Sequence, residues 1–257
     1  MKRPFLILYG LTAYALFNLS FVYMLGFLLD VGVPKAVNDG PLVPEFQALA
    51  INLFLIFLFG FFHSLMARDS FKRWWTRIVP VDAERPTYVM QSAVFLAAAM
   101  VFWQPMPQVI WQLDGAAIPA AHVLFAIGVI TLLTSTFLID HFELFGVKQV
   151  LLANDDRELP EPVFVQPFLY RIVRHPMQLG MVTLLFATPL MTVGHLVFAA
   201  SMTAYVLIGL YFEEKSLVRQ FGQQYRDYQK RVPMLVPGLK FGAASDVGTR
   251  AEVGGVK

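Results

Sequence analysis

The segment that decides the fold reads Tyr170-Arg-Ile-Val-Arg174-His175-Pro176-Met-Gln-Leu-Gly180. Proline is favoured in the first turn of a helix, where its missing N–H is not needed. We therefore expect Pro176 to begin a helix and His175 to be its N-cap. Free N–H groups at a helix start attract a carboxylate or phosphate, and the neighbouring arginines would strengthen that attraction. The segment predicts an anion site, although the arginines alone are also typical of residues that flank an ordinary membrane span.

The composition around this segment is that of an integral membrane protein. Of the 257 residues, 57% are hydrophobic and only 15% are charged, whereas soluble domains carry about 25% charged residues. The net charge of +2 gives no indication of a nucleic-acid partner. The chain has no cysteine, which excludes disulfides, thiolate metal sites and a cysteine nucleophile. The five histidines lack the spacing of metal ligands, so no metal is predicted.

The apolar segments predict an all-α fold, a polytopic membrane bundle of five to six transmembrane helices. A membrane helix needs about 20 apolar residues. After the last apolar segment, we expect the helix to continue past Glu213, to stop at Phe221-Gly222 and to restart as far as about Arg231. The last two segments should form a helical hairpin with Gly194 in its turn. The predicted helices are Phe5–Leu29, Phe46–Met66, Thr87–Trp103, Ile118–Ile139, Pro176–Met191 and Leu196–Phe212.

The distribution of lysine and arginine predicts the orientation. The first connection between apolar segments holds one basic residue, Lys35, and the third holds none, whereas the second, the fourth and the C-terminal segments hold many. By the positive-inside rule, both termini and the polar motifs are cytoplasmic. We divide the chain into N-terminal membrane helices (1–145), a part with a polar loop, the helical hairpin and the C-terminal helices (146–240), and a disordered tail rich in Gly, Ala and Ser (241–257).

Further polar residues lie where apolar segments end. Asp140 and Glu143 flank His141, and we expect them to hold one tautomer of the imidazole so that His141 serves as a base. The alternative is that His141 is simply a polar residue at a membrane boundary. His63 lies deeper in its span, where ionisable residues face the bundle interior, so we expect it to line the substrate site. Tyr211 is also expected on the substrate side.

The acidic pair Glu213-Glu214 follows the last apolar segment directly. Neighbouring side chains on a helix point about 100° apart, so only one carboxylate can easily face an internal site. We expect a glutamate of this pair to accept hydrogen bonds from a bound amine or ribose. The alternative is that both are interfacial acids that pair with Lys215 or Arg219.

From Tyr170 to Pro237 the sequence resembles the membrane methyltransferases typified by isoprenylcysteine carboxyl methyltransferase. These enzymes carry a similar RHPxxxG, a helical hairpin, then EExxL, FGxxY and VP. The segments Phe62–Met66, Thr136–Val150, Ala187–His195 and Thr203–Tyr205 are similar to the bacterial methanethiol S-methyltransferase branch. The resemblance implies S-adenosyl-L-methionine at the cytoplasmic face of a bacterial inner membrane, and a small thiol, methanethiol, that becomes the thioether dimethyl sulfide.

The resemblance also implies the residues of the site. It places the acceptor among the membrane helices of 1–145 and the cofactor in 146–240, and membrane lipid would surround the spans. For the methyl transfer that it implies, our own hypothesis is that His141, positioned by Asp140 or Glu143, is the base. The expected cofactor contacts are Gln149, Val163, Phe164, Val165, Tyr170, Arg174, His175, Pro176, Met177, Gln178, Gly180, Glu213 and Glu214.

Two positions depart from the wider family. Gln178 replaces a usual aromatic residue, and Gly209 replaces the arginine that the carboxyl methyltransferases carry for their prenylcysteine substrate. A carboxylate substrate would lose its counter-ion here, whereas a neutral thiol needs none. Two alternatives remain at this point: a larger lipophilic acceptor such as a prenylcysteine or a phospholipid amine, and a non-enzymatic membrane factor of the denitrification-associated family.

Overall fold

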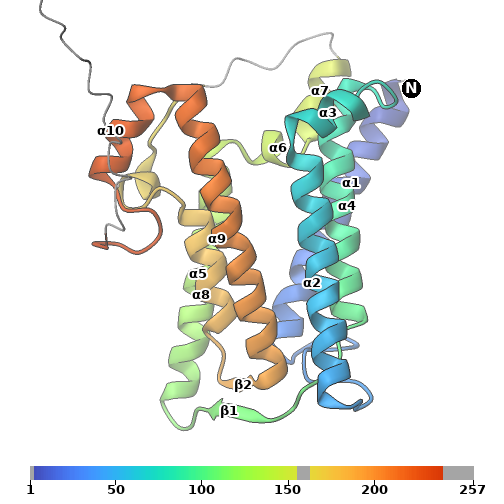
Figure 1. Cartoon of the computed structure of the whole chain (residues 1–257), viewed down its shortest axis with the longest axis vertical. Coiled ribbons are helices and arrows are strands. Elements are labelled where there is room, and N and C mark those ends of the chain that lie inside the picture. Colours follow the sequence, from blue (N-terminus) through green and yellow to red (C-terminus); the bar gives the residue numbers. More distant parts are fainter. Residues whose placement is uncertain (1–2, 155–162, 240–257) are drawn as a thin grey trace, which may run out of the picture.

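A computed structural model describes residues 3–154 and 163–239, and shows long helices that run between two ends of the molecule (Figure 1). The N-terminal part holds α1 (Arg3–Leu29), α2 (Glu45–Ala67), the short α3 (Asp69–Trp75), α4 (Val81–Val101) and β1 (Val109–Gln112). The remaining elements are α5 (Ala117–Ile139), α6 (His141–Leu144), α7 (Val147–Asn154), the 3-10 helix η1 (Phe168–Arg171), α8 (Pro176–Phe186), β2 (Leu190–Thr192), α9 (Val193–Phe221) and α10 (Gln223–Arg231).

The expectation of a helical, polytopic membrane bundle is confirmed. Within the described residues, α1, α2, α5 and α9 are long and apolar enough to cross a membrane, and α8 is a shorter apolar helix. The helix α4 has 21 residues, carries Asp82 and Glu84 in its first turn, and packs along α1 and α2. Thus α4 and α8 accompany the four long apolar helices.

Two groups of helices pack against each other along an aromatic core. In Figure 1, α1, α2 and α4 lie on one side and α5, α8 and α9 on the other, with α2 in contact with α9. Between them Phe198 contacts Phe27 and Trp103, with ring centroids 5.5 and 5.2 Å apart, and all three side chains are buried. Aromatic pairs at such distances add to the free energy gained from burial. The core therefore fixes how the two groups of helices meet.

A two-stranded antiparallel sheet closes one end of the bundle and corrects two predicted boundaries. The predicted helix to Met191 ends at Phe186, because the chain then forms β2, which pairs with β1. The helix α9 begins at Val193, so Gly194 lies in its first turn and not in the turn of the hairpin. A Cβ on Gly194 would lie 2.9 Å from the backbone nitrogen of Met106. Only glycine allows α9 to start so close to the β1 segment.

The same end is held together by polar contacts between connections. Thr192 caps α9 by accepting a hydrogen bond from the N–H of His195 at 3.2 Å, and its hydroxyl donates to Asn38 at 2.7 Å. Lys35 donates to the carbonyls of Val101 and Trp103 at 2.7 and 2.8 Å, where the C-terminal carbonyls of α4 need partners. This end of the molecule is therefore closed by its own chain.

The other end carries α3, α6, α7 and α10 (Figure 1). As predicted, α9 continues beyond Glu213, stops at Phe221, and α10 restarts and ends at Arg231. Gly222 has φ 58°, a conformation that glycine adopts readily, and it turns the chain between these helices. The turn brings α10 back toward the start of α8. The predicted disordered tail, 241–257, lies outside the described residues.

Candidate active site

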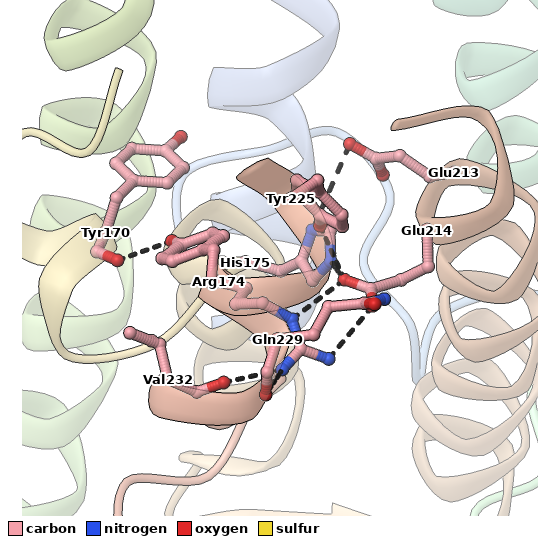
Figure 2. A network of polar contacts seen from close by, with 9 residues as sticks. Tyr170, Arg174, His175, Glu213, Glu214, Tyr225, Gln229 and Val232 are labelled. Carbon is pink, nitrogen blue, oxygen red and sulfur yellow. Dashed lines mark hydrogen bonds and ion pairs between the residues drawn. The ribbon is translucent and has the colours of Figure 1, made fainter. Parts of the chain in front are cut away.

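Glu214, near the end of α9, is the centre of a polar network (Figure 2). Arg174 donates to both of its carboxylate oxygens at 2.9 Å, and His175 donates from Nε2 at 2.7 Å. From α10, Tyr225 donates at 2.7 Å and Gln229 at 2.5 Å. Burial and the carboxylate together raise the pKa of Tyr225. These contacts occupy both carboxylate oxygens of Glu214 within the protein, and the expectation that it binds a cofactor stays a prediction.

Arg174 also makes several hydrogen bonds within the protein. Besides its two bonds to Glu214, it donates to the carbonyls of Gln229 and Val232 at 3.2 and 2.5 Å. Its side chain is 9% exposed. The guanidinium therefore links α9 and α10 to the segment before α8, and the expectation that Arg174 contacts a cofactor also stays a prediction.

The segment after α10 pairs with the start of α8 through the backbone. The N–H of Arg174 donates to the carbonyl of Pro233 at 2.9 Å, and the N–H of His175 donates to that of Met234 at 3.1 Å. Tyr228 donates from its hydroxyl to the carbonyl of Tyr170. The sequence motifs around His175 and Pro233, far apart in the chain, therefore form one structural unit.

Glu213 points to another side of α9, where its carboxylate contacts His175 (Figure 2). Its side chain is 47% exposed, and its Oε1 lies 3.9 Å from Nδ1 of His175. Burial and the charge of Glu213 raise the pKa of Tyr170, whose hydroxyl donates to the carbonyl of Ser135 at 3.3 Å. Glu213 is therefore the more exposed of the two carboxylates beside the start of α8.

The remaining residues expected near the cofactor have different surroundings. Pro176 is the first residue of α8, as predicted, and Met177 packs against the main core. Phe164 packs against the rings of Tyr225 and Tyr228, with centroids 5.8 and 5.4 Å apart. Phe164 therefore belongs to the packing of α10. Three further expected residues are exposed or half-buried side chains near this unit: Val163, Val165 and Gln178.

Gly180 has a packing role, and its expected place among the cofactor contacts stays a prediction. It is buried where α8 crosses α5, and a Cβ here would lie 2.6 Å from the carbonyl oxygen of Gly128 and 2.6 Å from the nitrogen of Leu132. Small residues allow two membrane helices to approach closely. Gly180 therefore sets the distance between these helices.

His141 is held by two hydroxyl groups and not by the neighbouring acids. Its Nδ1 lies 2.8 Å from the hydroxyl of Thr136, and its Nε2 lies 2.8 Å from the hydroxyl of Tyr14. The imidazole is 6% exposed and stacks on Phe137 with centroids 4.1 Å apart. Burial lowers the pKa of His141. The expectation that Asp140 or Glu143 holds this imidazole is wrong.

Asp140 and Glu143 instead bind Lys148, at 2.5 and 2.9 Å. These hydrogen bonds raise the pKa of Lys148. Asp140 caps α6 by accepting from the N–H of Glu143 at 3.0 Å, so its side chain turns away from the imidazole. Burial favours the neutral form of Asp140, but the hydrogen bonds outweigh it and lower its pKa.

Gln149 lines a cavity of about 650 Å³ between α3, α4, α6 and α7. Its amide nitrogen donates to the carbonyl of Glu143 at 2.9 Å, and its buried oxygen has no hydrogen-bond partner among the described residues. Tyr170, His175 and Glu213 are absent from the lining of this cavity. The other polar side chains that line it are all charged: Lys72, Asp82, Glu84, Arg85, Asp140 and Glu143.

His63 belongs to a polar cluster that the sequence did not reveal. Its Nε2 lies 2.5 Å from the hydroxyl of Tyr88, and its Nδ1 lies 2.9 Å from the hydroxyl of Ser92. The signal available in the sequence was the spacing of Tyr88 and Ser92, which are four residues apart and so share a helix face. Tyr211, in contrast, is 55% exposed, with Lys215 over its ring at 4.0 Å. The structure does not bring Tyr211 to this cluster.

Comparison with known families defines the class of this protein. Residues 116–224, which include α5, α8 and most of α9, match the family model described as phospholipid methyltransferase. Together with the apolar helices and the polar unit at the start of α8, this match identifies a membrane methyltransferase.

Individual relatives define the family. The chain is 48% identical to the Methanethiol S-methyltransferase of Mycobacterium tuberculosis, over 92% of this chain and 98% of that protein. It is 47% identical to the enzyme of that name from Pseudomonas deceptionensis, over 91% and 90%, and 46% identical to one from a Pseudomonas strain, over 90% and 89%. The chain belongs to the methanethiol S-methyltransferase family. The alternative of a non-enzymatic factor is therefore wrong. No solved structure matches this chain.

Proposed function

We propose that this enzyme uses S-adenosyl-L-methionine to methylate a small thiol, methanethiol, and releases dimethyl sulfide. The observation that carries the proposal is the different use of two adjacent glutamates. Glu214 is hydrogen-bonded to Arg174, His175 and α10, whereas Glu213 lies near the start of α8 with a more exposed carboxylate. Relatives that cover almost the whole chain carry the name Methanethiol S-methyltransferase, which supports the acceptor.

The residues around Glu213 fit this methyl donor. The first N–H groups of α8 lack acceptors within the helix and suit the carboxylate of the donor. Glu213 suits its amine or ribose hydroxyls. The donor supplies a methyl group on a sulfonium, which is already activated. The protein must therefore chiefly align the two reactants.

The position of Gly209 supports a neutral acceptor. A Cβ at Gly209 would meet no atom within 4 Å, so the space next to α9 at this position is open. No basic side chain stands at this position to pair with a carboxylate substrate. We propose that 1–145 form the acceptor side and 146–240 the donor side. In a bacterial inner membrane with both termini cytoplasmic, the donor would arrive from the cytoplasm.

The test is donor binding and product detection with the purified protein in lipid nanodiscs. Gas chromatography should detect dimethyl sulfide when methanethiol and S-adenosyl-L-methionine are both added. In calorimetric titrations, Glu213→Gln should weaken donor binding about tenfold or more, because hydrogen bonds to charged groups contribute about 1.5–3 kcal/mol. Asp227→Asn, at an exposed position of α10, is the matched control and should bind the donor normally.

Two results would overturn the proposal. Wild-type protein that does not bind S-adenosyl-L-methionine would exclude the donor. Methylation of phospholipid amines in the nanodisc without any dimethyl sulfide would exclude the thiol and favour the larger lipophilic acceptor.

A further inference from the structure

The pair of His63 and Tyr88 has a defined arrangement of protons. Ser92 donates its hydroxyl hydrogen to the carbonyl of Tyr88 at 2.7 Å. The oxygen of Ser92 must therefore accept from Nδ1–H of His63, 2.9 Å away. This leaves Nε2 of His63 as an acceptor, and the hydroxyl of Tyr88 donates to it at 2.5 Å. In a neutral imidazole, the hydrogen bond that one nitrogen makes determines whether the other nitrogen carries a proton. The neutral pair is thus ready to move a proton from the tyrosine to the histidine.

The oxygen of Tyr88 has lone pairs that can accept a further proton, and charged groups lie near it. Glu213, on α9, is close enough for its charge to act on Tyr88, and Arg85 lies over the Tyr88 ring at 5.1 Å. Both His63 and Tyr88 are half-buried. The charged and titratable groups that face the pair are Glu84 and Arg85 on α4, and Tyr205 and Glu213 on α9.

An apolar groove adjoins this pair. The groove, of about 480 Å³, lies between α2 and α9, and its lining includes Ser64 and Tyr205, whose hydroxyls lie 3.1 Å apart. The ring of Tyr205 stands edge-on to that of His63, with centroids 6.0 Å apart. The groove therefore offers a largely apolar space for a small thiol next to Tyr205, whose ring contacts that of His63.

The bundle contains a second pair of the same kind, Tyr14 and His141, in which Thr136 takes the place of Ser92. Thr136 gives its own hydrogen to the carbonyl of Leu133 at 2.7 Å, so the proton arrangement is the same. Here the imidazole is buried and surrounded by aromatic rings, which leave no room for a reactant: Tyr14, Phe137, Phe142 and Phe145. The surroundings therefore distinguish the two pairs.

We propose that Tyr88 and His63 remove the proton of the thiol acceptor, a role that rests on the methyl transfer proposed above. The S–H bond breaks and its proton goes to the oxygen of Tyr88, while the proton of Tyr88 goes to Nε2 of His63. The electron pair left on the thiol sulfur forms the new bond to the methyl group of the sulfonium donor. The electron pair of the broken carbon–sulfur bond stays on the donor sulfur. An alkanethiol is a weaker acid than cysteine, whose pKa is about 8.5, so this deprotonation needs a base near neutral pH.

Tyr88→Phe tests the proposal because it removes only the hydroxyl. The turnover of methanethiol at neutral pH should fall on the order of 100-fold, the usual contribution of general base catalysis. The affinity for the methyl donor should stay at the wild-type value. The loss should be much smaller with trifluoroethanethiol than with ethanethiol, since the fluorinated thiol ionises more easily without a base. His63→Gln should show the same dependence on the acidity of the thiol.

Tyr14→Phe is the matched comparison, because it removes the hydroxyl of the second pair. Any loss of its activity should be equal for the two thiols. The proposal is overturned if Tyr88→Phe retains wild-type turnover of methanethiol, or if its loss is the same for ethanethiol and trifluoroethanethiol. A loss that depends on thiol acidity in Tyr14→Phe alone would assign the proton to His141 instead.

A spectroscopic measurement on the wild-type protein needs neither turnover nor a stable variant. A nonreactive donor analogue with an amine in place of the sulfonium would be bound first, and ethanethiol would be added near neutral pH. The ultraviolet absorbance of a thiolate should appear in the difference spectrum. Its absence would overturn the proposal, whereas absence of dimethyl sulfide in the earlier assay would overturn the proposed function itself.

Discussion

Glu213 and Glu214 are neighbours in the chain, yet their surroundings predict different effects of substitution on stability. Glu214→Gln should destabilise the protein, because the largely buried guanidinium of Arg174 loses its counter-charge. Breaking a buried pair by removing one partner costs about 3–5 kcal/mol. Glu213→Gln removes an exposed carboxylate with no hydrogen-bond partner among the described residues, so the melting temperature should change little. Thermal unfolding in nanodiscs, followed by scanning fluorimetry, measures both.

Equal melting temperatures for the two variants would contradict this division. The methyl donor provides an internal check, because it should raise the melting temperature of Glu214→Gln if the remaining fold still binds it. It should raise that of Glu213→Gln only at higher concentration, since this variant is expected to bind it more weakly.

The sequence predicted that only one of these glutamates could face an internal site, and this followed from helix geometry alone. Helix geometry did not indicate which one, because that depends on Tyr225 and Gln229, which α10 brings back beside α9. The error at His141 has the same origin. Adjacency suggested that Asp140 and Glu143 hold the imidazole, whereas one of its actual partners, Tyr14, lies 127 residues away in the sequence.

The crossing of α5 and α8 leads to a prediction about packing. Gly180→Ala places a methyl group 2.6 Å from backbone atoms of Gly128 and Leu132, so the two helices must move apart. Overpacking of this kind costs about 1–3 kcal/mol, and the melting temperature should fall accordingly. Gly209→Ala is the matched control, since its Cβ meets no atom within 4 Å. It should leave the melting temperature unchanged or raise it, because alanine favours helices over glycine by about 1 kcal/mol. A larger loss in the control would show that the crossing is not tight.

The long helices were predicted well because about 20 consecutive apolar residues identify a membrane-crossing helix by length alone. The helix ends near the two-stranded sheet were predicted less well. The strands β1 and β2 have four and three residues, and their pairing joins segments about 80 positions apart, which no local pattern reveals. The predicted helix from Pro176 therefore ran too far, to Met191, and the actual helix ends at Phe186.

The arrangement of the whole molecule explains why motifs from distant parts of the sequence meet at one end. The loop before α8, the last turns of α9, and α10 gather there, whereas the sheet closes the opposite end (Figure 1). The sequence placed these motifs on one side of the membrane through their lysines and arginines. It could not show that the backbone after α10 pairs with Arg174 and His175, because that contact depends on the turn at Gly222.

This arrangement predicts opposite accessibility for two engineered cysteines, and the absence of natural cysteines makes the labelling specific. Leu42, in the connection between α1 and α2, is 71% exposed at the end with the sheet. Lys230, whose side chain is 65% exposed, lies in α10 at the opposite end. By the positive-inside rule, Leu42→Cys should react with a membrane-impermeant maleimide in intact spheroplasts, and Lys230→Cys only after permeabilisation. The reverse pattern would place Glu213 on the outer side, where the cytoplasmic pool of methyl donor could not reach it.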